Sequence, residues 1–162
     1  MLTQEDLLNC YVTPQLETYF LKKCPGISIE ELTLRLSELL KFLSLSHHAI
    51  VDIPVSSEID ELWHLWILET KQYHVLCEKL PSGKYLHHLS KDFPHEGQEM
   101  DALKRSNLQL SLLVSYVHNF GSFTEKSLPY WPIAYNMYRC MDQNLETLNT
   151  YLIDLKSQQK AA

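Results

Sequence analysis

The chain has 162 residues, 45% of them hydrophobic and 21% charged, and its formal net charge is −6 with the histidines neutral. This length and composition are typical of one soluble domain, residues 1–162, that buries a substantial core. The negative charge and the lack of a run of Lys or Arg argue against nucleic acid or an anionic membrane as the principal partner, because phosphate binding needs a positive surface.

The sequence shows no targeting or disulfide signal. No apolar stretch approaches the length of a membrane span, and the start, MLTQEDLLNC, lacks the basic and apolar regions of a signal peptide. We therefore expect a cytoplasmic protein whose partner is a small molecule or another protein. The four cysteines, Cys10, Cys24, Cys77 and Cys140, form no CxxC pair, so we expect reduced and mostly buried thiols.

Three helices are predicted in the first third of the chain. Thr3 with Asp6 is a capping box that opens a short helix, and Thr13-Pro14 starts a second helix that ends at Pro25-Gly26. Ser28 with Glu31 caps the third, which has the strongest helical pattern in the chain. Its apolar stripe repeats every three or four residues at Leu32, Leu36, Leu39, Leu40 and Leu43. The run AIVDIPV after His47-His48 is expected to be an extended connector, since Pro54 cannot donate to a sheet.

Three longer helices follow. Ser57 is the expected N-cap of a continuous helix over about 58–79, which the Pro81–Gly83 turn ends. Further helices are predicted over about 98–119, where Gly121 supplies the left-handed C-terminal residue, and over about 133–157. With no convincing strand, the expected fold is all-α, an irregular bundle of five or six helices.

The stretch around the fourth predicted helix holds most of the residues suited to chemistry. Asp60 and His64 are four apart and project from one helix face, while His87 and His88 lie beyond a turn that can fold back along it. Imidazole and carboxylate together suit zinc or iron(II). Adjacent residues of an extended segment point in opposite directions, so we expect only one of the histidine pair, with His88 favoured, to join a metal site. The alternative is a hydrogen-bonded core in which His64 is a neutral, buried imidazole.

Other candidate groups are weaker. On a continuous helix Cys77 lies roughly 20 Å, and His74 about 15 Å, from His64, so neither shares one ion with it. No HExxH, GxSxG, P-loop or dinucleotide-binding motif occurs. His47, His48, His95 and His118 have no evident ligand partner, and the aromatic group Tyr130, Trp131, Tyr135 and Tyr138 is more typical of a core or an interface than of a ligand cage.

Two blocks of this sequence, within about residues 54–132, resemble the glycine-rich domain-containing-protein-like family. The first block comprises Asp60, Trp63-His64, Ile67-Leu68, Thr70, Tyr73, Cys77, Gly83 and His87-His88, and the second comprises Tyr116, Phe120-Gly121 and Trp131-Pro132. Trp66 stands where many members carry a second histidine. The resemblance implies a shared polar centre and supplies no reaction.

We consider two functions from different classes. In the first, Asp60, His64 and His87 or His88 bind a divalent metal, Trp63 and Tyr73 pack around the centre, and metal-activated water supports a hydrolase or oxidase. In the second, the chain is a non-enzymatic interaction module. The same histidines and aspartate then form a structural hydrogen-bond network, and the aromatic loop over 123–135 contacts a partner protein.

Overall fold

A computed structural model describes residues 3–46, 54–88 and 101–159. Within these ranges the chain forms eight α-helices, one short 3-10 helix and no strand, so the predicted all-α class is confirmed. The helices are α1 (Gln4–Tyr11), α2 (Pro14–Lys23), α3 (Ile29–Leu45), α4 (Ser57–Leu68), α5 (Thr70–Lys79), α6 (Ala102–Phe120), η1 (Leu128–Tyr130), α7 (Pro132–Cys140) and α8 (Leu145–Gln159). His47, His48, His95 and most of the expected AIVDIPV connector lie outside the described residues.

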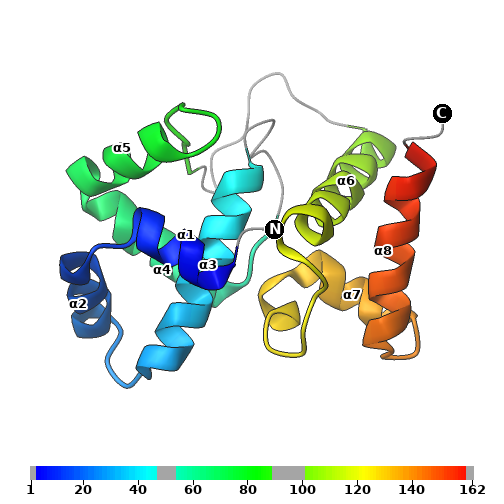
Figure 1. The fold of residues 1–162 in the computed structure, drawn as a ribbon, viewed down its shortest axis with the longest axis horizontal. Coiled ribbons are helices and arrows are strands. Elements are labelled where there is room, and N and C mark those ends of the chain that lie inside the picture. Colours follow the sequence, from blue (N-terminus) through cyan, green and yellow to red (C-terminus); the bar gives the residue numbers. More distant parts are fainter. Residues whose placement is uncertain (1–2, 47–53, 89–100, 160–162) are drawn as a thin grey trace.

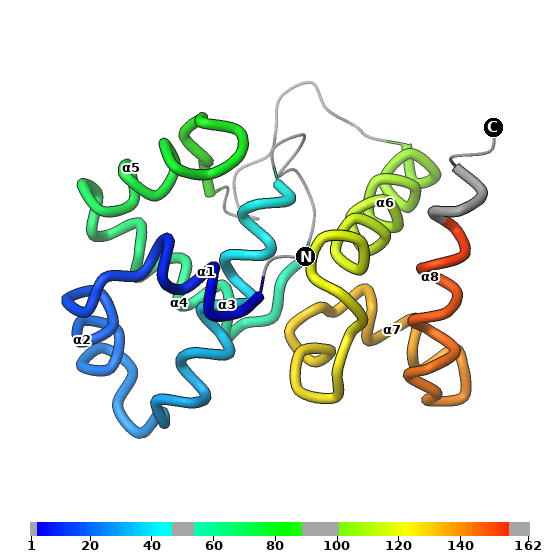
Figure 2. The backbone as a smooth tube through the Cα atoms, in the orientation of Figure 1, coloured from blue at the N-terminus to red at the C-terminus, as the bar shows by residue number. Residues whose placement is uncertain are grey.

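Helix α3 is the centre of the arrangement. It packs against α1, α2 and α4 on one side and against α6 on the other, with α7 and α8 beyond α6 (Figure 1). The tube in Figure 2 shows the first five helices gathered in one half and α6 to α8 in the other. The five stripe leucines of α3 are all buried, as the spacing predicts. The core therefore surrounds the helix with the clearest sequence signal.

Three of the four predicted N-cap residues agree with the structure. Thr3 forms a complete capping box with Asp6, and the side chains of Thr13 and Ser28 accept backbone N–H groups at the starts of α2 and α3. At α4 the cap is Ser56, one residue earlier than expected, and its hydroxyl accepts Ile59 N–H at 3.4 Å.

The prediction of five or six helices is wrong because two expected helices are each divided. The helix expected over 58–79 breaks at Glu69, whose ψ of 64° is not helical. The helix expected over 133–157 ends at Cys140, and Asp142 and Gln143 then adopt positive φ angles of 51° and 54° before α8 begins. Neither break contains the glycine or proline that normally marks one.

The loop before α7 is anchored in the interior. Glu38 on α3 is 1% exposed, and its carboxylate accepts Trp131 Nε1–H at 2.8 Å and the Tyr116 hydroxyl at 3.1 Å. Lys41 Nζ donates to the same carboxylate at 2.7 Å. About two turns earlier on α3, Glu31 accepts the Tyr130 hydroxyl, and this hydrogen bond lowers the pKa of Glu31.

Most large side chains of the aromatic loop over 123–135 therefore belong to the core, and its contact with a partner protein stays a prediction. Its large side chains are needed to fill the space between α3 and α6 and to reach the two carboxylates. The buried members are Phe123, Leu128, Tyr130 and Trp131, whereas Tyr135 is exposed.

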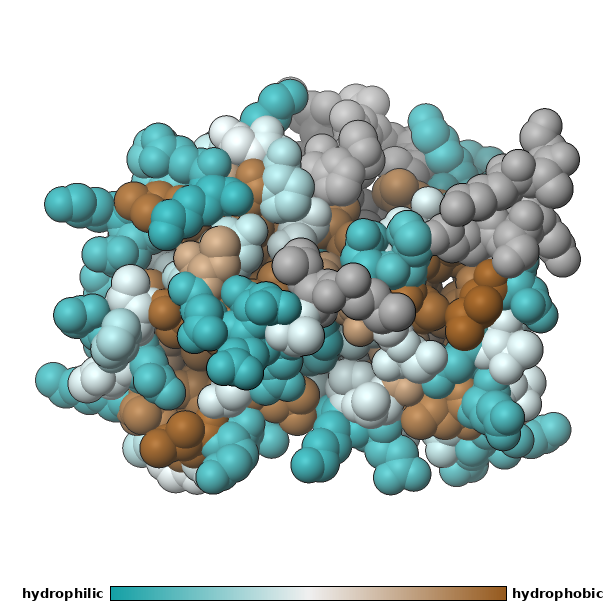
Figure 3. All heavy atoms as spheres, viewed as in Figure 1, coloured by the Kyte–Doolittle hydropathy of each residue, from teal (hydrophilic) through white to brown (hydrophobic). Residues whose placement is uncertain are grey.

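Hydrophilic side chains cover much of the face drawn in Figure 3, and hydrophobic residues show in separate patches. The most exposed large hydrophobic side chains, Ile29, Leu68, Leu103 and Ile153, lie on four different helices. No helix in the described part of the chain combines the length and apolarity needed to cross a bilayer. The expectation of mostly buried thiols is wrong, since Cys77 is buried and Cys24 is half-buried but Cys10 and Cys140 are exposed.

Candidate metal centre

Three of the four predicted site residues lie together. Asp60 and His64 are one turn apart on α4, and His88 approaches them from the segment that follows α5. One ligand atom from each of the three residues lies within 4.8 Å of the others. The cluster therefore joins two parts of the chain that are separated by the whole of α5.

Asp60 contacts both imidazoles. The Nε2–H of His88 donates to Asp60 Oδ1 at 2.7 Å, and the Nδ1–H of His64 donates to the Asp60 carbonyl oxygen at 2.8 Å. The two rings lie 4.3 Å apart between centroids. Side-chain exposure is 16% for His88, 41% for Asp60 and 55% for His64, so one side of the cluster faces solvent.

His87, the fourth predicted residue, does not join the cluster. Its ring is exposed and lies 4.9 Å from the ring of Tyr85, two residues earlier. Burial alternates along this segment, with Leu86 and His88 turned inward and Tyr85 and His87 turned outward. This alternation is the behaviour of an extended chain, in which adjacent side chains point to opposite sides.

The backbone of Leu86 is held on both sides by α5. The Tyr73 hydroxyl donates to the Leu86 carbonyl oxygen at 2.6 Å, and Leu86 N–H donates to Cys77 Sγ at 3.5 Å. Trp63 Nε1–H donates to the Tyr73 hydroxyl at 2.9 Å, and the Trp63 ring meets the His88 ring edge-on at 4.4 Å. Burial of Tyr73 raises the pKa of its hydroxyl, which keeps the proton that the Leu86 carbonyl accepts.

The two α5 residues considered as ligands lie apart from the cluster. The break at Glu69 removes the distance argument against Cys77, yet its sulfur is buried and contacts the Leu86 amide rather than Asp60 or His64. His74 is exposed and pairs with Glu78 at 3.3 Å. This second His–acid pair has the same four-residue spacing as Asp60 and His64 and belongs to no group of three ligands among the described residues.

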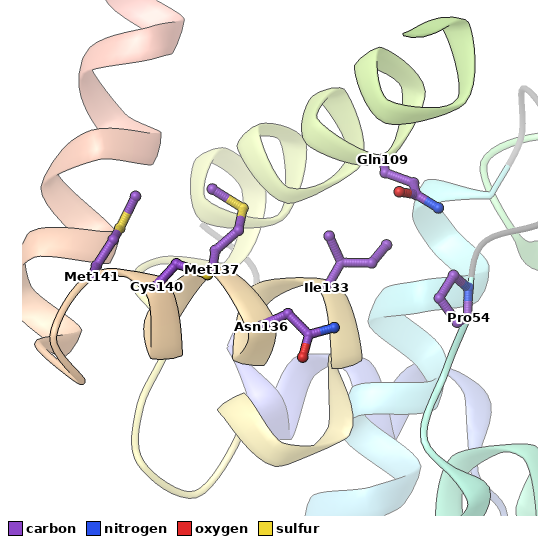
Figure 4. A pocket seen from close by; sticks show the side chains of 7 residues that line it. All are labelled: Pro54, Gln109, Ile133, Asn136, Met137, Cys140 and Met141. Atoms are coloured by element: carbon purple, nitrogen blue, oxygen red, sulfur yellow. The ribbon is translucent and has the colours of Figure 1, made fainter. Parts of the chain in front are cut away.

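A separate groove of about 490 Å³ lies between α6, α7 and the connector before α4 (Figure 4). It is lined by Pro54, Gln109, Ile133, Asn136, Met137, Cys140 and Met141. No charged side chain is among these lining residues, and none of them belongs to the histidine–aspartate cluster. The groove and the cluster are therefore distinct features.

The family described as UCP032817-like matches residues 3–161, nearly the whole chain. The chain belongs to the UCP032817-like family. The resemblance to the glycine-rich domain-containing-protein-like family is therefore wrong. Several of the residues that carried it, such as Trp63, Tyr73 and Cys77, are buried and hold the α4–α5 region together, and such packing residues do not by themselves distinguish families. No curated protein and no solved structure matches the chain.

In this UCP032817-like chain, Trp66 is a core residue. It is fully buried and meets Phe20 edge-on at 5.5 Å, on the side of α4 that faces α2. Its position three residues after Trp63 therefore serves the packing of α2 against α4 and adds no ligand to Asp60, His64 and His88.

Two contacts in this member of the UCP032817-like family were not predicted from its sequence. One is the hydrogen bonding of the Glu38 carboxylate with Tyr116 and Trp131, which lie far from it along the chain. The other is the pairing of Leu86 with Tyr73 and Cys77. The four-residue spacing of Tyr73 and Cys77 is a signal for the second, because it puts a hydroxyl and a thiol on one helix face.

Proposed function

We propose that this protein binds one divalent metal ion through Asp60, His64 and His88 and leaves at least one coordination position open. The proposal rests on one observation, the convergence of three ligand atoms within 4.8 Å. Ligands at about 2.0–2.2 Å from a tetrahedral ion lie roughly 3.4 Å apart, so small side-chain adjustments suffice to close the cluster around an ion.

The orientation of His64 supports this role. Metal-binding histidines commonly donate their second ring N–H to a carbonyl or carboxylate, which fixes the tautomer and the ring plane. The Nδ1–H of His64 makes such a bond to the Asp60 carbonyl, which leaves Nε2 as the nitrogen for an ion. For His88, an ion at Nε2 replaces the proton now shared with Asp60 Oδ1, and the remaining ring proton moves to Nδ1.

Two histidines and one carboxylate are the ligand set of open zinc sites and of non-haem iron(II) sites. With zinc, the fourth position holds a water that the ion activates as a nucleophile, and the reaction is a hydrolysis. With iron(II), the open positions admit an oxidant, and the reaction is an oxidation. The exposure of His64 and Asp60 gives a small-molecule substrate a direct approach to the ion.

The test is metal analysis of protein purified without a histidine tag. We expect about one equivalent of zinc or iron per chain in the wild-type protein and little in His64→Ala, because two ligands hold such ions far more weakly than three. His74→Ala is the matched control, since it removes an exposed imidazole with an acidic partner at the same helical spacing, and it should retain the metal.

The second candidate is a structural hydrogen-bond network without a metal. It is favoured by the 2.7 Å contact of His88 with Asp60, which already ties the segment after α5 to α4. A wild-type protein that binds no added zinc or iron(II), and in which His64→Ala only lowers the melting temperature, would replace the first proposal with this one.

A further inference from the structure

His88 reaches Asp60 only if the segment after α5 is held in a fixed position against α4 and α5. This segment has no secondary structure of its own. Residues 85–88 belong to no helix or strand. Both backbone groups of Leu86 are nevertheless paired, the carbonyl oxygen with the Tyr73 hydroxyl at 2.6 Å and the N–H with Cys77 Sγ at 3.5 Å. Two side chains one turn apart on α5 thus hold this segment as a neighbouring strand would.

The same hydroxyl is linked to the ring of His88 by a second route. Trp63 Nε1–H donates to the Tyr73 hydroxyl at 2.9 Å, and the Trp63 ring supports the His88 ring at 4.4 Å. On a continuous helix, Trp63 and Tyr73 lie about 15 Å apart along the axis. The break at Glu69 turns α5 so that the two side chains meet.

We infer that Tyr73, together with Cys77, is a positioning residue of the metal centre. The Tyr73 hydroxyl fixes the Leu86 backbone and the Trp63 ring, and through both it sets the place of the His88 imidazole relative to Asp60 and His64. This inference rests on the proposed function, and it adds residues that touch neither the ion nor its ligands' donor atoms.

The variant Tyr73→Phe tests the inference because it removes only the hydroxyl. Zinc affinity is measured by competition with a chromophoric chelator, below the melting temperature of every variant. We expect roughly 10- to 100-fold weaker binding, the range found when groups that orient metal ligands are removed. The saturating stoichiometry should stay at one, because all three ligands remain.

Tyr19→Phe is the matched control. The Tyr19 hydroxyl also donates to a backbone carbonyl, that of Leu65 on α4, at 3.2 Å, and it interacts with the Glu69 side chain rather than with Trp63, Leu86 or His88. We expect its zinc affinity to stay close to that of the wild-type protein. Equal affinities in the wild-type protein and both variants would overturn the inference, and so would an equal loss in both variants, because that result is a general effect of destabilisation.

Two further measurements cover the remaining outcomes. If Tyr73→Phe does not fold, Cys77→Ala removes the acceptor of Leu86 N–H, and it should weaken zinc binding in the same direction, whereas unchanged binding would count against the inference. A wild-type protein that binds no metal contradicts the proposed function. In that case the positioning role is tested by proton NMR of the metal-free protein, which detects the contact between the Trp63 and His88 rings. We expect this contact to be lost in Tyr73→Phe. If it persists in that variant, the inference is overturned.

Discussion

Glu38→Ala is expected to lower the free energy of unfolding by about 3–5 kcal/mol, the range for removing one partner of a buried charge network. The Glu38 carboxylate accepts hydrogen bonds from Trp131 Nε1, the Tyr116 hydroxyl and Lys41 Nζ. Its loss leaves the Trp131 and Tyr116 donors without their carboxylate acceptor. The Lys41 ammonium group, which is only 12% exposed, loses its ion pair and keeps the neutral Tyr116 hydroxyl at 3.2 Å as an acceptor. Urea unfolding at neutral pH, followed by circular dichroism, measures the effect.

Glu31→Gln on the same helix is the control for this experiment. Glu31 accepts the Tyr130 hydroxyl and pairs with Arg35, but its side chain is 37% exposed. Water can therefore solvate the groups that lose a hydrogen bond or an ion pair in the variant. We expect a loss of about 1 kcal/mol or less. A Glu38→Ala protein as stable as Glu31→Gln would contradict the assignment of Glu38 as the main polar connection between α3 and the loop before α7.

Asp60→Asn is expected to weaken zinc binding by more than about 100-fold, beyond the effect of removing an orienting group. Asp60 supplies the only carboxylate of the cluster and contacts both histidines, so its loss removes a ligand and the negative charge that offsets the ion. The metal-free variant should be nearly as stable as the wild-type protein, because the amide oxygen of asparagine still accepts the His88 N–H. Isothermal titration with zinc measures the first effect, and thermal unfolding in a chelator measures the second.

Glu61→Gln controls for the loss of one negative charge from α4. Glu61 is the next residue along the helix, it is exposed, and it lies outside the cluster. Its zinc affinity should match that of the wild-type protein. If Glu61→Gln weakens zinc binding as much as Asp60→Asn does, the protein attracts zinc through its general surface charge, and Asp60 is not a metal ligand.

The starts of α1, α2 and α3 and the leucine stripe of α3 were predictable because they depend on neighbours within one or two turns. The helix break at Glu69 was not predictable, because Glu69 and Thr70 are ordinary residues and the apolar stripe continues past them into α5. The second break depends on Asp142 and Gln143 in left-handed conformations, which residues other than glycine adopt infrequently. Both breaks are imposed by packing rather than by local signals.

The candidate site was predictable only in the part that depends on residues close together in the sequence. The four-residue spacing brings Asp60 and His64 together, and the alternation of an extended chain allows only one of His87 and His88 to face them. We expected His88 rather than His87, but the sequence does not decide between them, because the inward side is set by the contacts of Leu86 with Tyr73 and Cys77. Those contacts depend on the break at Glu69, so they follow from the tertiary structure and not from the sequence pattern.

The most direct test of the proposed metal centre is X-ray diffraction from crystals soaked in zinc, recorded on both sides of the zinc absorption edge. We expect one strong anomalous peak about 2.0–2.2 Å from a carboxylate oxygen of Asp60 and from ring nitrogens of His64 and His88. Zinc bound only elsewhere, for example between His74 and Glu78, would contradict the proposal, as would His64 and His88 rings that face solvent separately with no peak between them.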